Sequence, residues 1–80
     1  MKTADTLSGV VLDDVAAAAS VRARGWKLDR IQVAWKTQNY RVILTRPDTW
    51  MTAASVLHRH INDALDDAIE RAHAIDRGID

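Results

Sequence analysis

The residues of this chain best suited to chemistry are its three histidines and the carboxylates near them. His58 and His60 lie two positions apart, and residues at that spacing do not share a helical face, so one metal ion cannot bind both. Asp66, Glu70 and His73 do share a face, and their oxygen and nitrogen donors suit a divalent ion. An exposed acidic helix face is far more often simply solvated. We therefore expect no metal site and no cofactor.

A catalytic site would need an activated nucleophile or a phosphate-binding loop. His60 with Asp63 or Asp67 could form a catalytic dyad, but no serine of the chain stands in a recognisable nucleophile setting. The three glycines are scattered and form no glycine-rich loop, and the absence of cysteine removes thiolate chemistry and disulfides. We expect no catalytic residue and no enzymatic activity.

Charge is the strongest functional signal, because a formal net charge of zero conceals segregation along the chain. Residues 22–47 hold seven cations against one carboxylate, a balance of +6, whereas residues 61–80 hold six carboxylates against two arginines, a balance of −4. Such asymmetry indicates partners rather than fold. It predicts an acidic helix face made of Asp63, Asp66, Asp67 and Glu70. It also predicts a basic hairpin face, usable for a partner or a nucleic acid, made of Arg30, Lys36, Tyr40, Arg41 and Trp26.

The aromatic residues divide between core and surface in this interpretation. Trp35 and Trp50 lie on faces that we expect to be buried. Trp26 follows a helix-ending glycine without an assigned partner, so it is the expected exposed aromatic anchor. Tyr40, at the hairpin tip, could stack on a base, although a solvated turn tyrosine is the commoner case.

One long amphipathic helix is predicted for residues 48–77, around which the other elements pack. Its apolar residues recur at spacings of three and four, which places them on one stripe. Asp48 stands at the N-cap position and Gly78 at the left-handed C-terminal position. The stripe comprises Trp50, Ala54, Leu57, Ile61, Ala64, Leu65, Ala68, Ala72 and Ile75.

The first half of the chain predicts a helix and a hairpin. Residues 6–24 favour a helix closed by Gly25, with a short strand over residues 8–12 as the alternative. Alternating apolar residues indicate strands over residues 27–36 and 40–46. A two-residue loop at Gln38-Asn39 would set Trp35 opposite Val42. The predicted fold class is a small single α+β domain, helix–β-hairpin–long helix (αββα), with two antiparallel strands packed on two helices.

The predicted final helix is longer than the domain that holds it. About 30 residues span roughly 45 Å, whereas an 80-residue domain has a radius of gyration near 12 Å and a diameter near 30 Å. Either the helix breaks around Asn62-Asp63, or its C-terminal half projects and requires a second chain. A homodimer is therefore one expectation. No apolar run approaches a membrane span or a signal-peptide core, and the lack of cysteine fits the cytoplasm.

In character, the chain resembles the small proteins encoded by phages and other mobile elements, including anti-CRISPR inhibitors. The resemblance rests on length, a single domain, the lack of an active site and segregated charge. It implies a non-enzymatic, stoichiometric inhibitor that binds a host nucleoprotein and obstructs target nucleic-acid binding through a charged surface. Two alternatives remain open: a small DNA- or RNA-binding protein that uses the basic hairpin, and an assembly subunit that pairs through its long helix.

Overall fold

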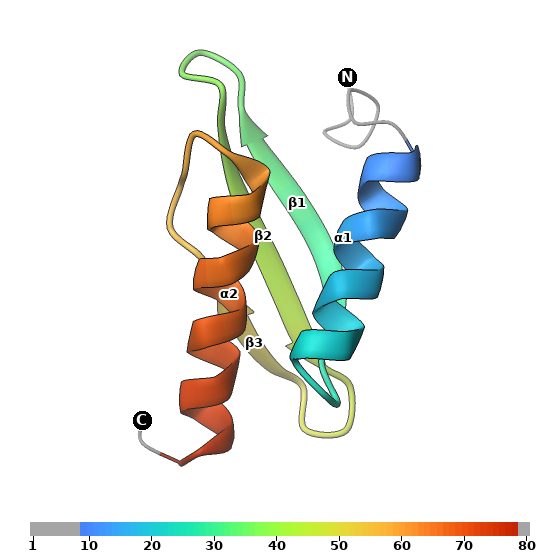
Figure 1. Ribbon diagram of the computed structural model, residues 1–80. Helices are drawn as coiled ribbons and strands as arrows, with labels where there is room; N and C mark the ends of the chain where they lie inside the picture. The colour runs from blue at the N-terminus through green and yellow to red at the C-terminus, as the bar shows by residue number, and fades with distance from the viewer. Residues whose placement is uncertain (1–8, 79–80) are drawn as a thin grey trace.

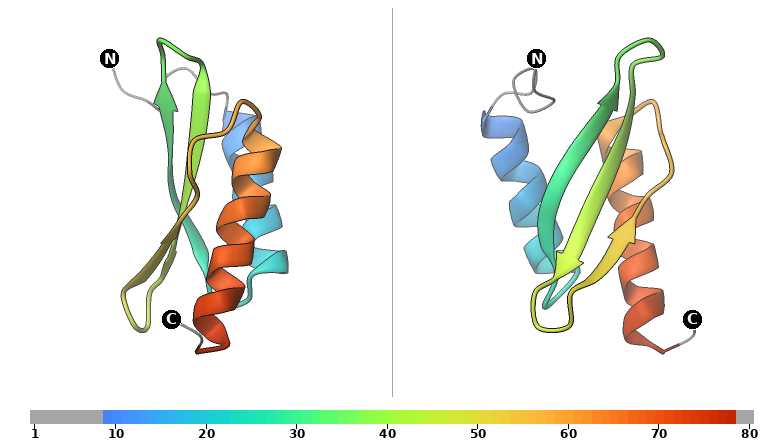
Figure 2. Two further views of the ribbon diagram at one scale, coloured as in Figure 1. Left: turned by 90° about the vertical axis from the view of Figure 1, so that its left-hand side faces the viewer. Right: turned by 180° about the vertical axis from the view of Figure 1, so that it is seen from behind.

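The computed structural model describes residues 9–78 and has two layers (Figure 1). Its elements in chain order are α1 (Gly9–Arg22), β1 (Lys27–Ala34), β2 (Asn39–Arg46), β3 (Met51–Ala54) and α2 (Ile61–Asp76). The strands form one antiparallel sheet in the order β1-β2-β3. Both helices cover the same face of this sheet, which leaves its other face open (Figure 2). The predicted α+β class is confirmed, but the two-stranded sheet is wrong because a third strand is present.

The α1 helix ends at Arg22, two residues before the predicted end at residue 24, and Gly25 closes it as predicted. Gly25 adopts a φ of +85°, a left-handed conformation that suits glycine and turns the chain toward β1. The backbone amide of Trp26 closes this turn on the carbonyl of Ala23 at 3.0 Å. The alternative strand over residues 8–12 is wrong for residues 9–12, which are helical, and Ser8 lies outside the described residues.

The β1–β2 hairpin keeps the predicted faces but not the predicted register. Ile31, rather than Trp35, lies opposite Val42, and the turn takes up residues 35–38 with Gln38 at a φ of 55°. The slip is four residues along β1, and an even slip leaves the side chains from Arg30 to Ala34 on their original faces. The predicted alternation is therefore confirmed for these residues and for β2, but a bulge between Leu28 and Arg30 breaks it at the start of β1, and the two-residue loop is wrong.

The predicted helix over residues 48–77 is also wrong before Ile61. Residues 47–50 form a turn, β3 pairs with β2, and α2 begins only at Ile61, close to the alternative break at Asn62-Asp63. A two-stranded hairpin is only marginally stable alone. Pairing a third strand therefore stabilises the fold more than a further turn of helix at the surface would. Leu57 and Trp50, expected in the core, are consequently 41% and 82% exposed.

The core lies between the two helices and their sheet face. Trp26, Val42 and Leu44 are its largest fully buried side chains, and burying one such side chain contributes about 1.5–3 kcal/mol. Small residues allow the layers to approach closely. They are Ala19, Ala23, Ala53, Ala64, Ala68 and Ala72, all buried.

The resulting shape matches the size expected for the chain. The radius of gyration is 12.1 Å. Ala68 and Ala72 are fully buried, so the C-terminal half of α2 does not project from the domain, and the reason for expecting a dimer through this helix is removed. Neither described helix combines the length and the apolar character that a bilayer crossing requires.

Candidate functional site

The sheet face that no helix covers carries a cluster of cations. Cross-strand partners share a face, so the register identifies which side chains lie there. Lys27 lies in one row with Thr45 and Thr52, and Arg30 lies in the next row opposite Ile43. We call this surface the open face. It comprises Lys27, Arg30, Gln32, Ala34, Asn39, Arg41, Ile43, Thr45, Thr52 and Ala54.

The open face has three cations and no carboxylate among its paired positions. Lys27 and Arg30 are exposed, and Arg41 is half-buried with its Nη1 donating to Gln32 Oε1 at 3.4 Å. Within residues 9–78, no carboxylate lies within salt-bridge distance of any of the three. Ile43 is only 6% exposed on this face although no helix lies above it. These cations remain available to an anionic ligand.

The residues predicted for the basic hairpin face divide between several locations. Arg30 and Arg41 lie together on the open face, and Lys36 lies in the exposed turn at its end. Tyr40 lies on the helix-covered face, where its backbone pairs with His58. Trp26 is only 1% exposed, so the expectation of an exposed anchor is wrong.

Two tryptophans differ from the sequence prediction in their exposure to solvent. Trp26 is buried because α1, the sheet and α2 meet over it, and its indole Nε1 donates to Asp76 Oδ2 at 3.0 Å, which satisfies the polar end of the ring. Trp35, expected in the core, is 50% exposed in the β1–β2 turn. The alternation of the strand extends to Trp35, but the turn of the β1–β2 hairpin projects beyond both described helices (Figure 2).

The carboxylates predicted for the acidic helix face do not form one free surface. Asp66 Oδ1 accepts from Arg22 Nη1 at 2.8 Å, an exposed ion pair that links α2 to α1. His73, on the same side of α2, binds the Arg22 carbonyl through Nε2 at 2.8 Å. Asp63 and Glu70 are exposed and have no partner among the described residues. Half of the predicted face is therefore already paired within the chain.

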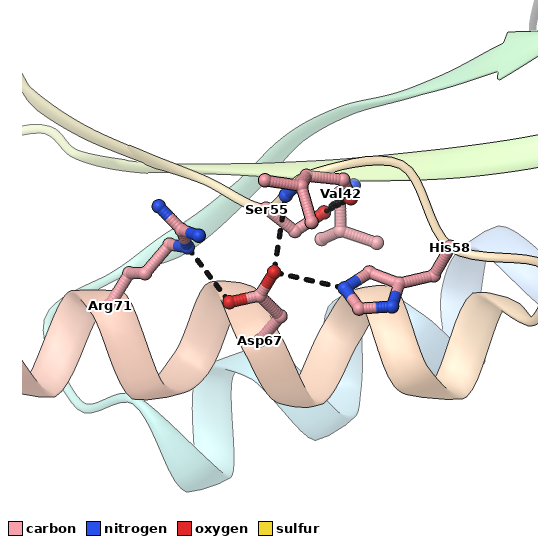
Figure 3. Close-up of polar contacts among 6 residues, drawn as sticks. Val42, Ser55, His58, Asp67 and Arg71 are labelled. Carbon is pink, nitrogen blue, oxygen red and sulfur yellow. Dashed lines mark hydrogen bonds and ion pairs between the residues drawn. The ribbon is translucent and has the colours of Figure 1, made fainter.

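Asp67 is the most constrained carboxylate of the described chain (Figure 3). One oxygen accepts from Arg71 Nε at 2.8 Å, and the other accepts from the Val56 amide at 3.1 Å and from His58 Nε2 at 2.9 Å. Partial burial raises its pKa, but the hydrogen bonds from His58, Arg71 and Val56 outweigh this effect and lower the pKa to about 2. Asp67 therefore stays ionised and joins the segment after β3 to α2.

This cluster has the residue types of a catalytic triad but not the connections. The sequence suggested His60 as the dyad histidine, whereas the structure places His58 against Asp67, because the residues before Ile61 are not helical. The Ser55 hydroxyl accepts from the Val42 amide at 3.0 Å and donates to the Val56 carbonyl at 2.8 Å. It is buried and bound to backbone, so no hydrogen bond joins it to His58. The cluster is suited to structural support.

Among residues 9–78, no group of three or more metal-ligating side chains is close enough to share an ion. No protein-family model, curated protein or solved structure matches this chain. Function is therefore inferred from charge, exposure and contacts.

The open face was partly visible in the sequence, since Arg30 and Arg41 were predicted to lie together. Lys27 was missed because the bulge at Asp29, between Leu28 and Arg30, shifts the alternation by one residue.

Proposed function

We propose that this protein is a non-enzymatic binding module whose open face holds the phosphate backbone of a nucleic acid. The observation that carries the proposal is the set of three cations on an uncovered sheet face, none of them paired with a described carboxylate. Lysine and arginine clusters supply most of the affinity for a phosphate backbone, independently of its sequence.

The spacing of these cations supports the same ligand. Lys27, Arg30 and Arg41 occupy three successive rows of the open face. Rows on one face of a strand lie two residues apart, roughly 6–7 Å. That interval is about twice the rise of about 3.4 Å per phosphate along one strand of a duplex. Polar side chains between the cations, including Gln32 and Asn39, can donate further hydrogen bonds to phosphate or sugar oxygens.

Binding should be measured by fluorescence anisotropy with labelled twenty-nucleotide single-stranded and duplex DNA and RNA. If three phosphates are neutralised, affinity for duplex DNA should fall roughly 40-fold between 50 and 200 mM salt, because counterion release gives a slope near −0.9 per phosphate. The variant Arg30→Glu with Arg41→Glu should abolish binding. Arg30 is exposed and Arg41 is half-buried, and neither is part of the core, so the circular dichroism spectrum should be unchanged.

The control variant is Arg59→Glu with Arg77→Glu. It makes the same change in net charge on exposed residues just outside the two ends of α2, away from the open face. This control should retain most of the affinity. Equal losses in the two variants, or no binding of any probe at 50 mM salt, would reject the open face as a phosphate site.

A second candidate function follows from the free carboxylates of α2. Asp63 and Glu70 are exposed and lack a partner among the described residues, which supports a protein that docks its acidic helix face on a basic groove. Such a protein would inhibit a host nucleoprotein, which is the function that the resemblance to mobile-element proteins implies. Its supporting residues are fewer than the sequence indicated, because Asp66 and Asp67 are engaged within the chain.

A further inference from the structure

Exposed apolar side chains gather at one edge of the sheet. Six large apolar residues of the described chain are exposed, and four of these flank β3. Trp50 and Met51 lie at its start, while Val56 and Leu57 follow its end. Exposed apolar side chains concentrated along one segment commonly mark an interaction site.

The two edges of the sheet differ in how they resist pairing. The edge formed by β1 carries Lys27, Asp29 and Arg30 and is interrupted by a bulge, which are the devices that proteins use to block an edge strand. The edge formed by β3 has none of them. Residues 50–57, which we call the uncharged edge segment, contain no charge, no proline and no glycine, although 28% of the whole chain is charged. The β3 edge is therefore open to another strand.

Backbone groups of β3 are turned toward this free edge. The amide of Ser55 donates to the Val42 carbonyl at 3.0 Å. The amides and carbonyls of an antiparallel ladder alternate in direction, so those of Thr52 and Ala54 point away from β2. The Val56 amide is occupied by Asp67, which ends the free stretch. A hollow between this strand and α2 is lined by Thr52, Ala53, Ala54, Arg71, Ala74 and Ile75, so side chains of α2 do not fill the space beside β3 completely.

The environment and the backbone conformation of Trp50, at the start of this edge, are energetically unfavourable in the isolated chain. It is 82% exposed and adopts a φ of 58°, a left-handed conformation that a bulky side chain rarely takes. Its amide donates to the Arg46 carbonyl at 2.7 Å, which fixes it in the turn before β3. Glycine or asparagine would fit this position better. Strained residues of this kind cluster at functional surfaces.

We propose that β3 pairs antiparallel with β3 of a second copy of this chain, forming a continuous six-stranded sheet. A two-fold axis at Ala53 sets Thr52 of one copy opposite Ala54 of the other, which matches the backbone groups that point outward. The same register sets Trp50 opposite Val56. Because of the two-fold axis this contact occurs twice, once at each end of the paired strands, as a self-complementary interface requires.

A second copy fits this edge better than a charged partner. The uncharged edge segment brings no like charges together when it meets itself, and it offers nothing to complement a charged strand. An aromatic side chain such as Trp50 can bury about 150–250 Å². Together with the partly exposed Met51, Val56 and Leu57, it presents roughly 400 Å² per chain. Two copies, with their paired backbones, approach the roughly 1,200 Å² of a stable interface. The axis is perpendicular to the sheet, so the two open faces lie on the same side of the dimer.

Sedimentation equilibrium from 1 to 200 µM tests this pairing without any nucleic acid, so its outcome does not depend on the proposed function. The wild-type chain should pass from 8.9 kDa to twice that mass. Val56→Lys with Leu57→Lys should remain monomeric and folded, because both side chains are substantially exposed. Val21→Lys is the matched control, since Val21 is 76% exposed on α1, and it should dimerise like the wild type.

Cross-linking tests the register and remains informative if the lysine variant fails to fold. The chain has no cysteine, so Thr52→Cys and Ala54→Cys chains can be mixed and oxidised. The mixture should give mainly a disulfide between the two different chains, because position 52 faces position 54 across the axis. A wild-type chain that is monomeric at 200 µM would overturn the proposal. So would a folded lysine variant that still dimerises, or a cross-link no stronger in the mixture than in either chain alone.

Discussion

Asp67 shows how a single side chain can connect parts of the fold that the sequence does not bring together. Its three donors come from the segment after β3, from His58 and from the next turn of α2. The sequence identified Asp67 as a surface carboxylate of an acidic helix face. It could not reveal the partners, because the helix predicted over residues 48–77 placed Val56 and His58 on the same helix as Asp67.

The network around Asp67 predicts a pH-dependent contribution to stability. Its pKa falls from an ordinary 3.8 to about 2 in the folded chain, so this stabilisation is fully present above about pH 4 and is lost as pH falls through 2. Asp67→Asn should lower the free energy of unfolding by about 1–2 kcal/mol at pH 7, a range that allows for solvent screening of the ion pairs. Urea unfolding at pH 7, 4 and 2 should show the difference disappear at the lowest pH.

Asp63→Asn is the control for this measurement, because Asp63 has no partner among the described residues. It should leave the free energy of unfolding within about 0.5 kcal/mol of wild type at all three pH values. A difference between Asp67→Asn and wild type that persists unchanged at pH 2 would show that the network stabilises through packing and not through charge.

At the scale of elements, the sequence was informative wherever a pattern was local. The C-terminal ends of α1 and α2 followed from Gly25 and Gly78, whose φ values of +85° and +70° are those of left-handed caps. The faces of β1 and β2 followed from alternation. The third strand was missed because Trp50, Ala54, Leu57 and Ile61 also fit a helical period. Strand formation there depends on pairing with β2, a contact that no local pattern encodes.

This reassignment predicts unequal effects of truncating Leu57, which the sequence placed on the buried stripe of the long helix, and Ile69, which it did not. Ile69→Ala should destabilise the fold by about 2–5 kcal/mol, because Ile69 is only 3% exposed and packs in the core. Leu57→Ala should cost less than about 1 kcal/mol, because Leu57 is substantially exposed and outside α2. Chemical denaturation at 1 µM, where a chain pairing through β3 is monomeric, would compare them. Equal losses would restore the long helix over residues 48–77.

At the scale of the whole molecule, the net charge is zero, but unpaired positive and negative side chains lie on two different surfaces. The open face carries Lys27, Arg30 and Arg41 without described carboxylate partners. The outer side of α2 carries Asp63 and Glu70 without described cationic partners. Between them, ion pairs such as Arg22–Asp66 and Arg46–Asp76 join the layers. The charge segregation seen in the sequence is therefore partly internal pairing and partly two separate unpaired surfaces.

Reversing the charge of the outer side of α2 distinguishes the two proposed functions. Asp63→Lys with Glu70→Lys breaks no described ion pair, so each should change stability by only about half a kcal/mol. The two reversals add two charges each and raise the net charge from zero to +4. If the open face binds phosphate, the added positive field should strengthen binding of the labelled twenty-nucleotide probes a few-fold at 50 mM salt, and this gain should shrink at 200 mM as the field is screened.

If the acidic helix face is instead the binding surface, the same folded variant should lose its protein partner in pull-downs from a host lysate, because like charges would then oppose a basic groove. Tighter nucleic-acid binding with unchanged protein capture assigns function to the open face. Lost capture without any nucleic-acid affinity assigns it to α2. The circular dichroism spectrum and the melting temperature separate both results from simple unfolding, because neither substituted side chain is part of the core.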